Sequence, residues 1–309
     1  MRNLWFSAVA VVVAALVFAA ARLIGNPYVY FAGYVVLQYV VLATAWNILG
    51  GYTGYVNFGT AAFFALGAYA TVVLHKIAPA TPLPAMMLVG GVLSALTGLG
   101  MGYLTLRLRG TFFSIATLAM AVVVQTLVTN WNFVGGSRGA YIIRPSHAPL
   151  FSGDYTQYLF LVMLGLCVVA IGIARAIEKS RLGFGFAAIR DDEHAAEASG
   201  VPTLRLKLIA TALSGGLMGM AGAPLPYYVT YLDPASGFNL SYAVNTIAMP
   251  LIGGTSTWAG PLIGAVLLGT LQQVATVTIS SALSLLIVGV LLVIFVIAAP
   301  RGIVGWFRR

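Results

Sequence analysis

The stretch from Arg175 to Lys207, RAIEKSRLGFGFAAIRDDEHAAEASGVPTLRLK, is the one strongly charged part of this chain. It holds six of the 16 Lys and Arg residues and five of the seven Asp and Glu residues, although only 7% of the sequence is charged. The sequence on either side is apolar, and no charged side chain occurs from Pro234 to Pro300. This asymmetry indicates a membrane-embedded body that presents one charged surface to a water-soluble partner.

The composition identifies an integral membrane protein. Of 309 residues, 60% are hydrophobic, and the mean hydropathy is +0.96, whereas soluble domains are about 45–50% apolar and about 25% charged. A helix that crosses the bilayer needs about 20 apolar residues, so this length accommodates roughly 10–12 spans. We therefore predict an all-α fold in which residues 1–309 form a single transmembrane domain, with no soluble catalytic domain and residues 175–207 as its cytoplasmic loop.

Charges, prolines and glycines divide the sequence into ten apolar segments, approximately residues 4–24, 28–49, 59–75, 83–106, 112–133, 155–174, 207–231, 240–254, 259–279 and 282–299. If each segment crosses and the N-terminus is inside, twelve basic residues lie inside and four (Arg22, Lys76, Arg138 and Arg144) lie outside. Cytoplasmic loops carry an excess of Lys and Arg. The pattern predicts about ten transmembrane helices with both termini in the cytoplasm.

Other global features exclude further classes of protein. The net charge of +9 does not indicate nucleic-acid binding, because the basic residues flank apolar runs as topology signals do. Cys167 is the only cysteine, so no intrachain disulfide forms. The first apolar run lacks a small-residue cleavage site before Pro27, and we expect an uncleaved span.

Two glycine-rich stretches interrupt apolar segments. Residues 50–59 (GGYTGYVNFG) and 251–261 (LIGGTSTWAGP) each contain a Gly-Gly pair followed by hydroxyl residues. Short, glycine-broken segments in corresponding halves of a transporter indicate a substrate pathway, and close helix packing through small residues is the alternative. We take as pathway candidates Gly51, Tyr52, Thr53, Gly54, Asn57, Gly253 and Gly254.

Small residues also recur at helical spacing in two apolar segments. One set is Gly90, Gly91, Ser94, Gly98 and Gly102, and the other is Gly215, Gly216, Gly219 and Gly222. Such stripes let the backbones of two membrane helices approach closely. We predict a packing role for both.

The loop from Phe133 to Tyr155 is the longest on the outer side. It contains Gly135, Gly136 and Ser137, followed by Arg138. Backbone N–H groups of such a run can surround an anion, although short glycine runs are mostly turns. We add Gly135, Gly136 and Ser137 to the pathway candidates.

Within the charged stretch, residues 186–199 read as one short helix that stops at Gly200 before Pro202. Phe186 and Ile189 lie three residues apart, and alanines leave a low surface edged by charges. Such a face suits a groove on a soluble partner; a merely solvated loop helix is the alternative. Because Asp191, Asp192 and Glu193 are adjacent, their side chains point in different directions and do not form a catalytic pair.

From about Leu42 to Arg301 the chain resembles the permease subunits of branched-chain amino acid ABC transporters, of the LivM type. The matching motifs are GYTGYVNFGTAAF (51–63), LRLRGTFF (106–113), GGS (135–137), AIRDDE (188–193) with Ala195, Ala196 and Gly200, and IGG (252–254) with Gly260 and Pro261. The chain departs from the family at His194, where the motif has Glu, and at Val134 and Arg138, where members often have Thr and an acid.

The resemblance implies that residues 186–200 are the coupling helix that docks on the ATPase. Its candidate coupling residues are Ile189, Arg190, Asp191, Asp192, Glu193, Ala195, Ala196 and Gly200. It also implies two ATP-binding subunits, a second homologous permease, an extracytoplasmic solute-binding protein, and the inner (plasma) membrane of a bacterium or archaeon. No GxxxxGK[ST] phosphate loop occurs, so a partner must hydrolyse ATP; we expect no catalytic site, metal or cofactor.

The cargo implied by the resemblance is a branched-chain amino acid; urea, short amides and small carboxylates are alternatives, because relatives of this fold carry them. An ion-coupled secondary transporter usually buries ionisable residues within its spans, and here the apolar segments have almost none. A membrane enzyme needs clustered acids or histidines, and His75, His147 and His194 fall at span ends or in loops.

Overall fold

The computed structural model describes residues 2–145, 154–278, 286, 289–290, 293 and 302–306, and these residues are almost entirely helical. The elements are α1 (Arg2–Ile24), α2 (Pro27–Thr53), α3 (Thr60–Ile77), α4 (Leu83–Thr105), α5 (Thr111–Thr129), η1 (Asn132–Val134), η2 (Gly136–Arg138), β1 (Ala140–Tyr141), α6 (Tyr155–Glu178), α7 (Arg181–Asp191), α8 (Glu193–Ala198), α9 (Thr203–Gly222), α10 (Leu225–Val229), β2 (Tyr231–Leu232), α11 (Pro234–Gly237), α12 (Leu240–Gly253), α13 (Ala259–Thr278) and α15 (Gly302–Trp306).

The all-helical membrane fold is confirmed. Each of the first nine apolar segments corresponds to a helix, and seven described helices are long and apolar enough to cross a membrane. The other two segments are α1, apolar from Ala8 to Ile24, and α12, which has only 14 residues. The tenth segment, residues 282–299, lies outside the described residues except at four positions.

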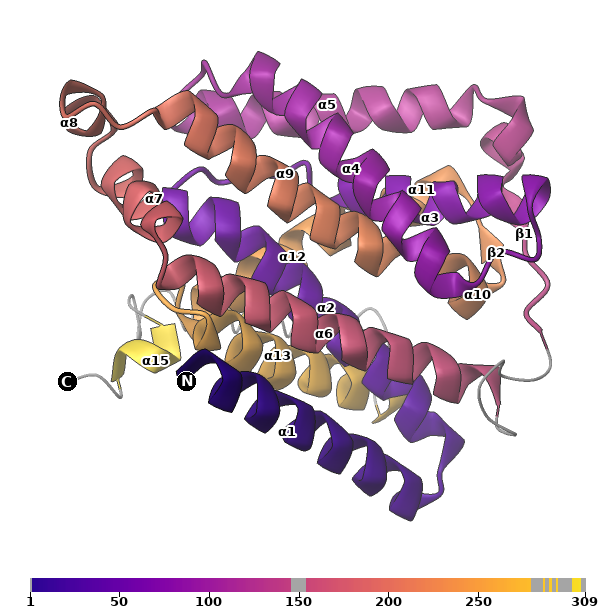
Figure 1. Cartoon of the computed structure of the whole chain (residues 1–309). Coiled ribbons are helices and arrows are strands. Elements are labelled where there is room, and N and C mark those ends of the chain that lie inside the picture. Colours follow the sequence, from indigo (N-terminus) through magenta and orange to yellow (C-terminus); the bar gives the residue numbers. More distant parts are fainter. Residues whose placement is uncertain are drawn as a thin grey trace.

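The bundle has two ends that carry different elements (Figure 1). At one end lie α7, α8 and α15, together with the start of α1; we call it the α7–α8 end. At the other end β1 pairs antiparallel with β2, and Ala140 lies opposite Leu232. This second end, the β1–β2 end, also carries η1, η2, α10 and α11 (Figure 1).

Helices α3, α4 and α9 pack backbone against backbone, as the two glycine stripes predict. A Cβ atom added to Gly67 of α3 would lie 2.6 Å from the carbonyl carbon of Gly219 in α9, and one added to Gly90 of α4 would lie 3.1 Å from the Cα of Gly67. Ser94 of α4 donates a hydrogen bond of 2.9 Å to the carbonyl of Phe63 in α3. Small residues let these helices approach closely, and they form a tight triad.

Helix α2 is the central element of the rest of the bundle. It packs against α6, α9, α12 and α13, and from Val40 to Thr53 its residues are all buried. The α12–α13 turn is fixed to α6 at the α7–α8 end, where the backbone N–H of Trp258 donates to Glu178 Oε2 at 2.9 Å. Next to it the Arg175 guanidinium lies 3.8 Å from the centre of the Phe6 ring of α1. These contacts join α1, α6 and α13 at one end.

Candidate functional site

The charged stretch forms two helices, α7 and α8, so the prediction of one helix over residues 186–199 is wrong. The backbone at Asp192 is extended, with φ −159° and ψ 109°. The Asp192 carboxylate accepts a hydrogen bond of 3.1 Å from the Ala195 N–H. An aspartate in this position begins a new helix rather than continuing the old one. The predicted stop is confirmed, since α8 ends at Ala198 and Gly200 has φ 82°.

The apolar face of α7 packs against the protein itself, which corrects the expectation that it faces a partner. Phe186 is 0% exposed and Ile189 is 3% exposed, and α7 packs against α2, α6 and α9. Ala196 of α8 is also buried. Most of the coupling candidates are exposed or partly exposed: Arg190, Asp191, Asp192, Glu193, Ala195 and Gly200. The outer surface of both helices is thus polar and small, apart from Phe184 at 72% exposure.

The three adjacent acids diverge, as predicted. Asp191 is exposed and pairs with its neighbour Arg190 at 3.3 Å. Asp192 caps α8. Glu193 turns into the protein, where its side chain is 12% exposed. Of these three acids, only Glu193 reaches the interior of the helix bundle.

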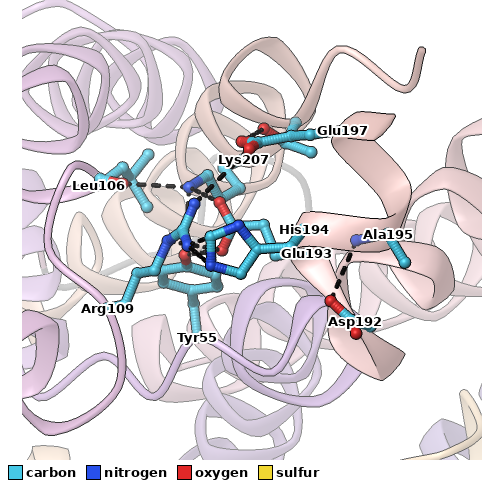
Figure 2. Close-up of polar contacts among 10 residues, drawn as sticks. Tyr55, Leu106, Arg109, Asp192, Glu193, His194, Ala195, Glu197 and Lys207 are labelled. Carbon is cyan, nitrogen blue, oxygen red and sulfur yellow. Dashed lines mark hydrogen bonds and ion pairs between the residues drawn. The ribbon is translucent and has the colours of Figure 1, made fainter. Parts of the chain in front are cut away.

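Glu193 meets a buried lysine and a tyrosine (Figure 2). Lys207, in the second turn of α9, is 3% exposed, and its Nζ lies 2.7 Å from Glu193 Oε1. The same Nζ donates to the Tyr55 hydroxyl at 3.1 Å and to the Leu106 carbonyl at 3.0 Å. Tyr55 in turn donates its hydroxyl proton to Glu193 Oε2. These side chains form a closed polar cluster at the α7–α8 end, which we call the Lys207 cluster.

Arg109 lies at the exposed edge of the Lys207 cluster. Its guanidinium is 3.6 Å from Glu193 and 3.6 Å from Glu197, and it contacts the His194 ring (Figure 2). Glu197 also accepts a hydrogen bond of 2.7 Å from Thr203, the first residue of α9. Exposed ion pairs of this kind contribute about 0–1 kcal/mol each. Arg109 therefore orders the edge of α8 more than it holds α8 in place.

The cluster changes the acidity of two of its members. Burial would raise the pKa of Glu193, but hydrogen bonds from Lys207 and Tyr55 and the charges of Lys207 and Arg109 outweigh it and lower the pKa below 4.5. Burial raises the pKa of Tyr55 above its ordinary value, and the adjacent Glu193 raises it further. Glu193 is thus a carboxylate and Tyr55 a neutral hydrogen-bond donor at neutral pH.

A recess of about 470 Å³ lies beside the cluster. Its walls come from the α2–α3 turn, the α4–α5 turn and α7, and include Thr53, Gly54, Arg109, Arg190 and Glu193. Gly54 has φ 78° and ends α2, and a Cβ atom there would lie 3.2 Å from the Arg190 side chain. The recess therefore lies at the α7–α8 end, between the two turns and α7.

The pathway candidates of residues 51–57 belong to this end of the bundle. The glycine-rich stretch 50–59 does interrupt the helices: α2 continues through Gly50 and Gly51 to Thr53, and α3 begins only at Thr60. Thr53 donates to the Leu49 carbonyl at 2.6 Å, and Asn57 accepts from the Gly59 N–H at 2.7 Å. Tyr52 donates to the Ala174 carbonyl of α6 at 3.4 Å. These bonds end α2 and begin α3.

The second glycine-rich turn lies next to the first. Helix α12 ends at Gly253, and a Cβ atom on Gly253 would lie 2.6 Å from the carbonyl carbon of Gly260. A Cβ atom on Gly51 would lie 2.8 Å from the Thr255 carbonyl oxygen. Gly254, with φ 115°, follows in the same turn. The structure thus brings the 51–57 and 253–254 candidates together.

The remaining pathway candidates lie at the opposite end. Gly135, Gly136 and Ser137 form the η1–η2 turn, and they line a polar recess of about 810 Å³ with Asn132 and Arg138. The Tyr231 hydroxyl of β2 donates to the Arg138 carbonyl at 2.8 Å. The three sets of candidates do not form one site, because this turn lies at the β1–β2 end and the other two lie at the α7–α8 end (Figure 1).

Between the two ends, polar side chains from three helices meet inside the bundle. Asn245 of α12 donates to the Tyr39 hydroxyl of α2 at 3.2 Å and accepts from Gln272 of α13 at 3.1 Å. Among the described residues, no three His, Cys, Asp or Glu side chains are arranged to hold a metal ion. The polar interior therefore consists of amides and hydroxyls.

The family of branched-chain amino acid transport system permease components matches residues 28–296. The chain belongs to this family. It is a permease component and not an enzyme, in agreement with the sequence prediction.

Two relatives match this permease over most of its length. LivM, the high-affinity branched-chain amino acid transport system permease protein of Salmonella typhimurium, is 27% identical over 297 residues, which cover 87% of this permease and 68% of LivM. The probable branched-chain amino acid transport permease protein LivH of Methanocaldococcus jannaschii is 24% identical over 282 residues, 86% of this permease and 88% of LivH.

A third relative is named for a different cargo. The ribose import permease protein RbsC of Bacillus subtilis is 30% identical over 197 residues, 58% of this permease and 59% of RbsC. No solved structure matches the permease.

Sequence reasoning missed the residues that join α8 to the bundle: Tyr55, Leu106, Arg109 and Lys207. One signal was available. Lys207 follows Leu204 and Leu206 and precedes Leu208 and Ile209, so it is a lysine inside an apolar helix. Such a cation must pair with an acid or with backbone carbonyls. In this permease it does both.

Proposed function

We propose that this permease is the membrane subunit of an ATP-binding-cassette importer that carries branched-chain amino acids. The observation that carries the proposal is the α7–α8 surface, an exposed pair of helices joined to the bundle through a buried ion pair. ATP-binding subunits dock on this surface, and their movement opens and closes the bundle. Two such subunits, a second homologous permease and an extracytoplasmic binding protein complete the importer.

The proposed topology follows from where the charges lie. Basic residues concentrate on α7, at the start of α9 and in the adjoining turns, and cytoplasmic loops carry such an excess. The α7–α8 end is therefore cytoplasmic, and the start of α1 and α15 lie there too (Figure 1). With α1, α12 and residues 282–299 added to the seven long helices, the permease domain of residues 1–309 crosses ten times. Its membrane is the inner membrane of a bacterium or archaeon.

We propose two glycine-rich gates along the path. Gly51, Tyr52, Thr53, Gly54 and Asn57 form the cytoplasmic gate with Gly253 and Gly254. Gly135, Gly136 and Ser137 form the outer mouth. The cytoplasmic gate adjoins the docking helices, since Gly54 packs on Arg190. A movement of α7 would reach this gate directly.

The branched-chain cargo is supported by relatives named for such transport. Uptake of labelled leucine by the assembled importer in liposomes tests it, with excess valine, urea or acetamide as competitors. We expect valine to compete and the amides to have no effect. Competition by urea or acetamide alone would contradict the branched-chain assignment. Leucine uptake by this permease alone, driven by an ion gradient, would contradict the whole proposal.

Docking on α8 is tested with two matched substitutions. Ala195 is an exposed residue of α8, and Ala80 is an exposed residue of the α3–α4 turn at the other end of the bundle. Ala195→Arg should abolish co-purification of the ATP-binding subunits, and Ala80→Arg should leave it unchanged. Ala196 is unsuitable because its side chain is buried. Normal co-purification with Ala195→Arg would contradict docking on this surface.

The side of the membrane is tested by labelling. A cysteine placed at the exposed Ser199, in a background without Cys167, should react with an impermeant maleimide only after the cells are opened. Reaction in intact cells would put α8 outside, where no ATPase can reach it.

A further inference from the structure

The buried Lys207 ammonium uses all of its hydrogen-bond donors. A lysine ammonium has three N–H donors and no acceptor. Here three acceptors surround it: Glu193 Oε1 at 2.7 Å, the Leu106 carbonyl at 3.0 Å and the Tyr55 hydroxyl at 3.1 Å (Figure 2). Since the number of donors equals the number of acceptors, displacing any one acceptor leaves a buried N–H group without a partner, which is costly.

The three acceptors come from three separate parts of the chain. Glu193 is the first residue of α8, Tyr55 lies in the α2–α3 turn two residues after α2 ends, and Leu106 is the residue that ends α4. Lys207 itself belongs to α9. One ammonium therefore ties the docking helix to the α2–α3 turn, which leads into α3, and to the near ends of α4 and α9.

Those three helices are the ones that pack backbone against backbone. Gly67 of α3, Gly90 of α4 and Gly219 of α9 meet deeper in the bundle and leave no room for side chains between them. Closely packed elements transmit displacement because interiors are dense and hardly compressible. A force on Glu193 would therefore act on the triad as a unit.

Few other contacts hold α8 to the bundle. Ala196 is its only buried residue, and Glu197 accepts a hydrogen bond of 2.7 Å from Thr203 at the start of α9. Arg109 and Glu197 are almost half exposed at the edge. Water competes for such exposed pairs. The Glu193–Lys207 pair is shielded, so it is the strongest polar connection between α8 and the triad.

We propose that Lys207 is the positioning residue that couples α8 to transport, because it converts movement of α8 into movement of α3, α4 and α9. The inference rests on the proposed function, in which α8 receives force from an ATP-binding subunit. Lys207 contacts neither ATP nor cargo. Its role is mechanical, and it predicts a variant that still hydrolyses ATP but no longer moves cargo.

Lys207→Met tests the coupling directly. The complete importer is purified, reconstituted with its binding protein and supplied with ATP, and leucine uptake and ATP hydrolysis are measured on the same liposomes. We expect the ATP-binding subunits to co-purify and hydrolysis to persist, while uptake per ATP falls by roughly 5- to 150-fold, the usual range of coupling between two sites. Lys179→Met, at an exposed lysine on the same surface, should leave uptake per ATP unchanged.

A double variant separates coupling from folding. Lys207→Met alone leaves Glu193 without its lysine, so it also lowers the melting temperature. Adding Glu193→Gln removes both charges, and replacing both partners of a buried pair restores much of the stability. If Lys207 couples α8 to the triad, the double variant recovers its melting temperature but its uptake per ATP stays low.

The outcomes decide between the two roles. Recovery of uptake in the double variant would show that Lys207 serves folding only, and wild-type uptake per ATP in the single variant would likewise overturn the coupling role. If the wild-type permease fails to bind ATP-binding subunits or to take up leucine, the proposed function falls, and the coupling role falls with it.

Discussion

Adding one methyl group at Gly67 should separate two helices of the α3–α4–α9 triad. The Cβ atom of Gly67→Ala would lie 2.6 Å from the Gly219 carbonyl carbon and 2.8 Å from its Cα. Carbon atoms in contact sit about 3.5–4.0 Å apart. Both neighbours are backbone atoms and cannot rotate away, so α3 and α9 must move apart by about 1 Å.

The expected cost follows from that gap. A radial gap of about 1 Å forfeits up to half of each contact energy, and a buried leucine-sized surface makes about 40–60 contacts of about 0.1–0.2 kcal/mol each. Half of that total is about 2–6 kcal/mol. The usual cost of overpacking a core is about 1–3 kcal/mol, so we expect the overlap of the two ranges, about 2–3 kcal/mol.

Gly165→Ala is the matched control. Gly165 lies in α6, is exposed, and no atom lies within 4 Å of its added Cβ. Both variants gain the same helix propensity, at most about 1 kcal/mol, so the difference between them isolates the clash. Unfolding by SDS in mixed micelles, followed by circular dichroism, should place Gly67→Ala about 2–3 kcal/mol below Gly165→Ala. Equal midpoints would show that α3 and α9 do not touch at this point.

Three further predictions concern single side chains. Because the folded-state pKa of Glu193 is lowered, its charge stabilises the protein above pH 4.5, and this stabilisation is lost as the pH falls further. Glu193→Gln should therefore lower the melting temperature at neutral pH, by an amount that shrinks in acid. A difference in melting temperature that does not depend on pH would contradict this. Asp192→Ala should remove the α8 cap, lower the free energy of unfolding by about 1 kcal/mol and speed amide hydrogen exchange in α8. The control Asp191→Ala should change the free energy of unfolding by less than about 0.5 kcal/mol. Equal exchange rates in the two variants would contradict the cap. Asn245→Leu should cost about 0.6–1.7 kcal/mol in SDS unfolding by breaking its bonds to Tyr39 and Gln272, and an unchanged midpoint would show that these bonds do not stabilise the bundle.

The sequence predicts those features that depend on local pattern. Apolar length gave the positions of nine helices, because each span must satisfy its own backbone in lipid. The stripes around Gly90 and Gly219 predicted close helix packing at both segments, and the structure shows that α4 and α9 pack there. Both signals lie within a single segment.

Features that depend on a choice between partners were harder to predict. The pattern of Phe186 and Ile189 shows that α7 has an apolar face but not what covers it, and the bundle covers it. Asp192 could sit within a helix or begin one, and its bond to Ala195 decides. The glycine-rich stretch 50–59 reads as a break, and the structure places that break after Thr53 rather than at Gly50 and Gly51. Contacts with distant segments settle the ambiguity for α7, whereas a local bond settles it for Asp192.

The placement of Lys207 explains why so apolar a helix keeps a charge. Burying a lone ammonium is expensive, and breaking a buried pair by removing one partner costs about 3–5 kcal/mol, so a purely structural helix would be more stable with an aliphatic residue there. A methionine at position 207 could fill the space but could not bond Glu193, Tyr55 and Leu106 at once. The three directed bonds fix how Glu193, Tyr55 and Leu106 lie relative to one another, and the proposed coupling requires that arrangement.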